Sequence, residues 1–103
     1  MKLYIARHGN AVSQAEDRSR PLSALGVSEI NRMTAFLADA GVRLFRVVHS
    51  GKTRARQTAE IYAQGLGKSL KTEEMAGLKP EDNPAVIAKM VHDLSVDTLI
   101  AGH

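Results

Sequence analysis

The stretch LYIARHGNA, residues 3–11, begins as a strand and ends in polar residues. Residues 2–6 alternate loosely between polar and apolar side chains, a pattern that is typical of a short strand. The run stops abruptly at Arg7, His8 and Gly9. A glycine beside a histidine allows another group to approach the backbone closely. These three residues form either a simple turn or a reaction centre, and the ends of the other predicted strands distinguish the two.

Strand-like and helix-like segments alternate along the rest of the chain. Ser23 is a suitable N-cap for the first helix, and Gly41 lies where a glycine commonly follows a helix end. Apolar residues at helical spacing support that helix, namely Val27, Ile30, Met33, Phe36, Leu37 and Ala40. The pattern predicts strands at 2–6, 44–48, 69–75 and 98–101, and helices at 24–40, 54–64 and 85–94. This alternation predicts an α/β fold, a three-layer sandwich with a mostly parallel central sheet.

Length and composition fit one soluble globular domain. The chain has 103 residues, of which 44% are hydrophobic and 24% charged, which are ordinary values. It has no cysteine, which rules out disulfides and thiolate metal sites. Its net charge of +3 is mild and it has no tryptophan, so neither a broad basic face nor stacking platforms indicate nucleic-acid binding. No segment resembles a signal peptide or a membrane span. We therefore expect a cytoplasmic protein.

Chemically active residues follow three of the predicted strands. In open α/β sheets, ligands bind beyond the carboxyl ends of the strands. If the strands are parallel neighbours, these ends bring four side chains together, namely Arg7, His8, Arg54 and His103. Two arginines and two imidazoles without an interleaved carboxylate suit a phosphoryl group, because the planar guanidinium fork matches phosphate oxygens. The sequence therefore predicts an anion site at this edge of the sheet.

Each of these residues, taken singly, also has a simpler interpretation. A lone histidine is more often structural than catalytic, and His49 can simply complete a strand end. We expect His92 to be a surface residue, and Lys52 and Arg56 to be solvated. A metal site built from three histidines, His8, His49 and His103, is a further alternative. Two neighbouring arginines disfavour it, because they would repel a cation.

Four motifs in order resemble the histidine phosphatase superfamily, whose fold is phosphoglycerate-mutase-like. They are ARHGNA (6–11), PLSALG (21–26), HSGKTRARQTAEIYA (49–63) and AGH (101–103). The small size of the chain and its RPLSALG segment most resemble the bacterial phosphohistidine phosphatases of the SixA type. The resemblance implies a phosphatase that needs no metal or other cofactor.

The resemblance also assigns roles to individual residues. It implies that His8 is the nucleophile, transiently phosphorylated, and that Arg7 and Arg54 bind the phosphoryl oxygens. His103 matches the second histidine of the pocket. Gly9 beside the nucleophile is expected to let the substrate approach. In the loop that follows, Arg18 and Arg20 either grip phosphate or an acidic protein surface, or are solvated, and Arg20 is the one that we assign to substrate binding.

The acid that protonates the leaving group has no clear candidate. The candidates in the middle of the chain are Glu73, Glu74, Glu81 and Asp82, and none lies in a convincing motif, so we expect exposed loop acids. A phosphoramidate nitrogen is protonated more easily than an alcohol oxygen. A missing acid therefore favours phosphohistidine as the substrate.

These inferences predict a monomeric phosphatase that acts on phosphohistidine in a protein, such as a phosphotransfer domain in signal transduction. The alternatives are a phosphatase for small phosphate esters and a non-catalytic module that binds phosphate or phosphoproteins. A phosphoglycerate mutase is disfavoured, because those enzymes carry long insertions that are absent here. Relatives continue beyond the histidine that matches His103. We therefore expect residues 1–103 to form a single histidine phosphatase domain that is truncated at its C-terminus.

Overall fold

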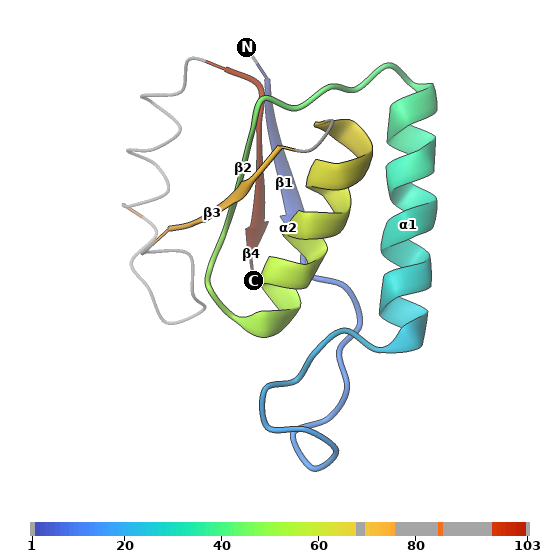
Figure 1. The fold of residues 1–103 in the computed structure, drawn as a ribbon, viewed down its shortest axis with the longest axis vertical. Coiled ribbons are helices and arrows are strands. Elements are labelled where there is room, and N and C mark those ends of the chain that lie inside the picture. Colours follow the sequence, from blue (N-terminus) through green and yellow to red (C-terminus); the bar gives the residue numbers. More distant parts are fainter. Residues whose placement is uncertain (1, 68–69, 76–84, 86–95, 103) are drawn as a thin grey trace.

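The computed structural model describes residues 2–67, 70–75, 85 and 96–102. Four strands and two helices are placed there, in the order β1 (Leu3–Arg7), α1 (Ala24–Asp39), β2 (Arg46–His49), α2 (Thr53–Leu66), β3 (Thr72–Glu74) and β4 (Thr98–Gly102) (Figure 1). This order agrees with the predicted alternation. The predicted helix at 85–94 lies outside the described residues, apart from Ala85. Neither described helix is long and apolar enough to cross a membrane.

The strands form a parallel sheet in the order β1-β4-β2-β3. The central strand β4 is buried from Thr98 to Ala101, as expected of a parallel strand that is covered on both faces. In the register, Arg7 of β1 is opposite Gly102, and His49 of β2 is opposite Ala101. The carboxyl ends of β1, β4 and β2 therefore meet at one edge, beside the start of α2 (Figure 1).

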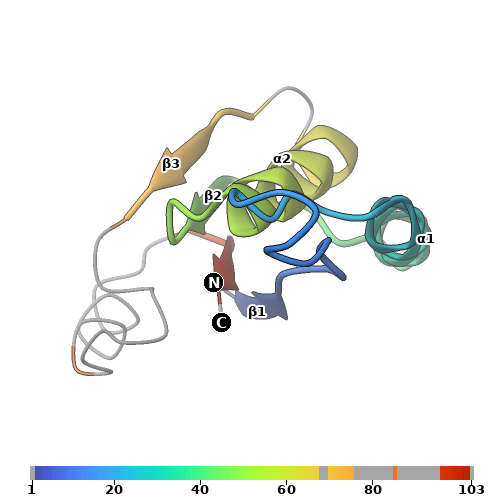
Figure 2. The same ribbon diagram turned by 90° about the horizontal axis from the view of Figure 1, so that it is seen from below.

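Both described helices lie on the same side of the sheet, with α2 against the strands and α1 beside α2 (Figure 2). The main core lies between them and the sheet, and its buried members are Ile30, Leu44, Val47, Ala59, Tyr62, Ala63, Leu66, Leu99 and Ala101. Val48 and Ile100 form a second cluster with Leu3 and Met75. Because successive strand residues point to opposite faces, this second cluster lies on the other face of the sheet. Burial on both faces is the arrangement of a layered α/β fold.

The helix α1 starts and stops as the sequence predicts. The Ser23 hydroxyl accepts a hydrogen bond from the Gly26 N–H at 3.0 Å. Gly41 follows the helix with a φ of +84°, the left-handed conformation that glycine adopts readily.

The buried stripe of α1 differs from the apolar spacing in the sequence. It consists of Gly26, Ile30 and Thr34, whereas Met33 is 48% exposed and Phe36 is 67% exposed. A stripe at i, i+4 and i+8 is narrow. It includes small and polar residues because α1 approaches other backbone closely: Gly26 lies against Asn10 and Thr34 lies against Gly65.

Backbone hydrogen bonds join the two ends of the loop between β1 and α1. The N–H of Val12 donates to the Pro21 carbonyl at 2.9 Å, and the N–H of Ser23 donates to the Asn10 carbonyl at 2.9 Å. Ala11 and Leu22 form an antiparallel bridge. The two ends of the loop therefore run side by side, next to the end of β1.

We expect Gly26→Ala to destabilise the protein, because a Cβ at this position would meet the backbone of Asn10, including its nitrogen at 2.9 Å. Overpacking of this kind costs about 1–3 kcal/mol, which corresponds to a fall in Tm of several degrees for a small domain. Thermal unfolding followed by circular dichroism measures the change. Gly41→Asn is the control, since position 41 has open space around it and Asn tolerates a positive φ. Equal losses in the two variants would contradict the close packing of α1 on the loop.

Candidate functional site

The side chain of His8 is fixed at the carboxyl end of β1. Its backbone N–H donates to the Gly102 carbonyl at 3.1 Å, which ties the end of β1 to the end of β4. On the ring, Nδ1 lies 2.8 Å from the Gly9 carbonyl oxygen, and Nε2 accepts a hydrogen bond from the Arg54 Nε–H at 3.2 Å. A carbonyl only accepts, so Nδ1 carries the proton. The lone pair of the imidazole is therefore on Nε2.

Three arginines act on this imidazole. Burial is the main cause that lowers the pKa of His8 below its usual value, and the bond to the Gly9 carbonyl opposes it. The positive charges of Arg54, Arg7 and Arg20 lower this pKa further. A neutral imidazole is the expected form at neutral pH, because a further positive charge beside these three guanidinium groups is unfavourable.

The positive charge of Arg20 also affects the pKa of Arg54. Burial, and then the charge of Arg20, lower the pKa of Arg54. Arg20 itself has a φ of +48°. Its N–H donates to the Asp17 carbonyl at 3.0 Å, and its Nε donates to the Val12 carbonyl at 3.1 Å. The loop thus holds a third arginine near the first two, and like charges gathered in this way favour an anion between them.

Thr58 links the end of β1 to α2, and sequence reasoning missed this role. Its hydroxyl accepts the Gly9 N–H at 3.1 Å and donates to the Arg54 carbonyl at 2.8 Å. The side chain is fully buried. The sequence offered one sign of it, a threonine on the apolar face of a predicted helix, four residues after Arg54. Nearby, the Gln57 side chain accepts the Leu22 N–H at 2.7 Å, so α2 is also fastened to the loop.

Further candidates from the sequence are a histidine and four acids, some of which lie outside the residues that the structure describes. His103 lies outside the described residues, as do His92, Glu81 and Asp82. Glu73 and Glu74 belong to the strand β3, which corrects the expectation of loop acids. Glu73 pairs with Arg46, with an N···O distance of 3.1 Å.

Among the basic candidates in the loop and in α2, Arg18 is exposed and is not one of the charges acting on His8. Arg56 is exposed and forms an ion pair with Glu60, with an N···O distance of 3.5 Å. Lys52 is half-buried. In the part of the chain that is described, no group of three or more His, Asp or Glu side chains is arranged to hold a metal ion.

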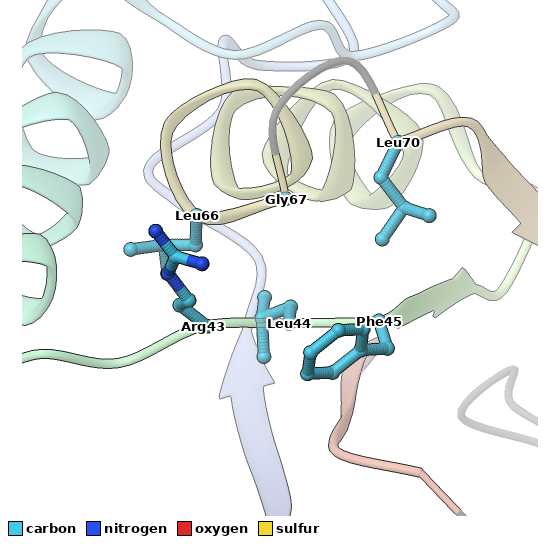
Figure 3. A pocket seen from close by; sticks show the side chains of 6 residues that line it. All are labelled: Arg43, Leu44, Phe45, Leu66, Gly67 and Leu70. Atoms are coloured by element: carbon cyan, nitrogen blue, oxygen red, sulfur yellow. The ribbon is translucent and has the colours of Figure 1, made fainter.

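A separate small hollow of about 170 Å³ lies at the other end of α2 (Figure 3). It is lined by Arg43, Leu44, Phe45, Leu66, Gly67 and Leu70. Three of these residues precede β2, and the others end or follow α2, so the hollow is at the amino end of β2. Among the described residues that line it, Arg43 alone is charged. The chemically active side chains are gathered at the opposite edge of the sheet.

We expect Arg20→Gln to raise the pKa of His8, because it removes one of the positive charges that lower that pKa. The expected rise is smaller than the whole lowering of the His8 pKa, because burial is the largest cause of that lowering. A titration of the His8 ring followed by NMR measures it. The matched control is Arg18→Gln, which removes a charge from the same loop and is expected to leave the pKa of His8 unchanged. A lower pKa in the Arg20 variant would contradict the proximity of this guanidinium.

We expect Thr58→Val to destabilise the protein more than Thr58→Ser. Valine keeps the volume but leaves the Gly9 N–H without its acceptor, and a buried unpaired donor costs about 1–3 kcal/mol. Serine keeps the hydroxyl and loses one methyl group. Urea unfolding gives the free energies, and hydrogen exchange at the Gly9 amide reports the bond directly. If the valine variant were the more stable of the two, the hydroxyl would have no anchoring role.

Comparisons with known proteins agree on one family. The model of the histidine phosphatase superfamily (branch 1) matches residues 3–80. Phosphohistidine phosphatase SixA of Escherichia coli K12 is 35% identical over 96 residues, covering 92% of this chain and 60% of SixA. The structure of the protein histidine phosphatase SixA complexed with tungstate matches with a TM-score of 0.86 at 28% identity, covering 100% of this chain and 69% of that one.

A phosphoglycerate mutase from Bacillus anthracis has the same fold, with a TM-score of 0.76 at 16% identity, covering 98% of this chain and 74% of that one. The predicted phosphoglycerate-mutase-like fold is thereby confirmed. The chain spans 40% and 60% of the lengths of two curated relatives that it matches. With three quarters of its residues matched by the family model, and with the fold shared, the chain belongs to the histidine phosphatase superfamily and is SixA-like.

Proposed function

We propose that this protein is a phosphohistidine phosphatase that works through a phosphorylated His8. One observation carries the proposal: the lone pair of a neutral imidazole, on Nε2 of His8, lies 3.2 Å from a guanidinium N–H of Arg54. A nucleophile and an oxyanion ligand are thus side by side. The SixA likeness supports the choice of activity. Tungstate, with which a SixA relative is complexed, is a tetrahedral oxyanion like phosphate.

In the first step, Nε2 of His8 attacks phosphorus in line with the bond to the substrate imidazole. The P–Nε2 bond forms while the substrate P–N bond breaks, and the leaving nitrogen keeps the electron pair and takes up a proton from solvent water. The N–H of Arg54 moves from Nε2 to a phosphoryl oxygen, where a charge-assisted hydrogen bond is stronger. Arg7 and Arg20 stabilise the remaining negative charge. The expectation that Gly9 leaves room for the substrate is not supported, because a Cβ there would meet Ile30 at 2.9 Å and Leu22 at 3.2 Å. The missing side chain makes room for α1 and the loop.

In the second step, water attacks phosphorus and the P–Nε2 bond breaks, which releases inorganic phosphate and the neutral imidazole. The Gly9 carbonyl, 2.8 Å from Nδ1, holds the ring proton on Nδ1 in both steps, so that the reactive nitrogen stays Nε2. We assign His103 to the second histidine of the pocket. The residue before it in sequence, Gly102, accepts the His8 N–H.

The proposed substrate is a phosphohistidine of a protein, such as a histidine phosphotransfer domain. A substrate imidazole leaves more easily than an alkoxide, so it needs less help from a carboxylic acid. Of the described mid-chain acids, Glu73 is engaged with Arg46, and the Glu74 carboxylate lies against Gly51. This arrangement favours phosphohistidine over alkyl phosphate esters.

The experiment compares the protein on a phosphohistidine protein and on alkyl phosphates side by side. We expect hydrolysis of phosphohistidine with a kcat/KM at least about a hundredfold above that for the esters, and an acid-labile label on the enzyme after a brief reaction with labelled phosphodonor. His8→Ala is expected to abolish the label and the turnover, because it removes the nucleophile. Arg54→Lys is expected to lower kcat/KM by about one to two orders of magnitude, because lysine lacks the planar fork.

Two outcomes separate the other interpretations. Equal efficiency on alkyl esters would make the protein a phosphatase for small phosphate esters instead. Binding of inorganic phosphate without label or turnover in the wild-type protein would make it a phosphate-binding module.

A further inference from the structure

We propose that His49 is a positioning residue that fixes the turn before α2 and, through it, the guanidinium of Arg54. His49 ends β2 and is almost fully buried, with 4% of its surface exposed. Its Nδ1 accepts a hydrogen bond from the Gly51 N–H at 3.1 Å. The inference rests on the proposed function only in taking Arg54 as a ligand of the phosphate.

The backbone of His49 is locked into the sheet. It is opposite Ala101 of β4 on one side and Glu74 of β3 on the other. Its carbonyl also accepts the N–H of Met75 at 2.9 Å. The ring therefore projects from a rigid backbone, and its acceptor Nδ1 can hold the residues that follow in one position.

The turn that receives this bond has an unusual shape. Gly51 has a φ of +92°, which only glycine adopts without strain. A Cβ there would lie 2.8 Å from the carboxyl carbon of Glu74. The turn is thus packed against the carboxylate at the end of β3, and the ring of His49 holds it from the side of β2.

The start of α2 lacks the usual side-chain cap. The N-cap residue is Lys52, which makes no capping hydrogen bond, since an ammonium group cannot accept one. The Lys52 N–H lies 3.5 Å from the Ser50 hydroxyl, a long contact. The bond from Gly51 to His49 does not cap the helix, since Gly51 precedes the N-cap residue, but it fixes the turn from which α2 begins.

The position of Arg54 depends on this helix start. Arg54 is the second residue of α2, three residues after Gly51, and its Nε must reach Nε2 of His8 across the sheet edge. Small displacements of a group that positions a reacting centre have large effects on rate. Loss of the His49 acceptor is therefore expected to weaken phosphate binding through the displacement of Arg54.

The bond also fixes the protonation state of His49. Because Gly51 donates to Nδ1, that nitrogen is unprotonated, and the neutral ring carries its proton on Nε2. Burial is the main cause that lowers the pKa of His49. Of the described charges around it, Glu74 on β3 and Glu60 on α2 raise this pKa, while Arg56 on α2 lowers it. The ring is then a neutral acceptor near pH 7.

The test compares His49→Phe with His49→Asn. Phenylalanine fills the space of the ring without an acceptor, whereas the asparagine oxygen accepts an N–H two residues ahead, as in an Asx turn. We expect His49→Phe to weaken the binding of inorganic phosphate about tenfold and to speed hydrogen exchange at the Gly51 amide. His49→Asn is expected to restore most of both, despite its smaller volume. Calorimetry gives the dissociation constants.

Two results would overturn the positioning role. One is unchanged phosphate affinity and Gly51 exchange in His49→Phe. The other is an equal loss in both variants, which would make His49 a packing residue. Should His49→Phe not fold, the wild-type protein supplies the test: nitrogen NMR must show an unprotonated Nδ1, and the Gly51 amide shift must titrate with His49. A protonated Nδ1 at neutral pH would reject the proposal.

Phosphate binding separates this inference from the proposed function. Binding without hydrolysis of phosphohistidine would reject the phosphatase and leave the role of His49 to be decided by the two variants. If Arg54→Ala bound phosphate as tightly as the wild-type protein, Arg54 would not be a phosphate ligand, and the link from His49 to the site would fail.

Discussion

Parallel pairing of β1, β4 and β2 in a single register is the constraint on which the candidate site depends. It places the end of β1 opposite Gly102 and the end of β2 opposite Ala101. The register is itself set by burial, because Leu99 and Ala101 face the helices while Ile100 joins the cluster on the other face. A slip of one residue would exchange these faces. It would also carry His8 away from the Gly102 carbonyl to which its N–H donates.

The second requirement is that positive charges be held together against their repulsion. Arg20 and Arg54 lie close enough for one to lower the pKa of the other. Each is fastened by bonds that do not involve an anion: Arg20 through the Val12 carbonyl, and Arg54 through the helix that Thr58 ties to Gly9. These hydrogen bonds therefore hold the arginines together against their repulsion before any ligand binds. Preorganised charge of this kind stabilises a phosphoryl group with little reorganisation.

Sequence periodicity predicted the order of the described elements, the caps at Ser23 and Gly41, and the strand ends where the site lies. It placed the start of β2 too early, at residue 44. The Leu44 N–H donates to the Leu66 carbonyl at the end of α2 instead of to a strand, and apolar character alone does not distinguish these two partners. Periodicity also did not identify which residues of α1 are buried, because close approach to Asn10 and Gly65 selects Gly26 and Thr34.

The contacts that periodicity missed are polar side chains bound to backbone groups. Thr58 lies on the apolar face of a predicted helix, which by itself indicates only packing, and its partner Gly9 is 49 residues away in sequence. His49 was interpreted as a strand end, but its ring accepts the N–H of Gly51, in a turn where Gly51 has a positive φ. No hydrophobic pattern encodes such bonds, since the first depends on where two segments meet after folding and the second on the local shape of a turn. The motif ARHGNA indicated the chemistry of the site, but the connections that position it came from the structure.

The electronic state of His8 follows from the same geometry. Its pKa is lowered mainly by burial and further by three arginines, which keeps the ring neutral. The Gly9 carbonyl acts in the opposite direction on the pKa, yet it determines which nitrogen holds the single proton. A neutral ring with Nδ1–H leaves Nε2 as the nitrogen that accepts from Arg54. An anion that draws this guanidinium N–H onto its own oxygen releases the lone pair of Nε2. In the proposed reaction, the substrate that binds the arginine thereby activates the nucleophile beside it.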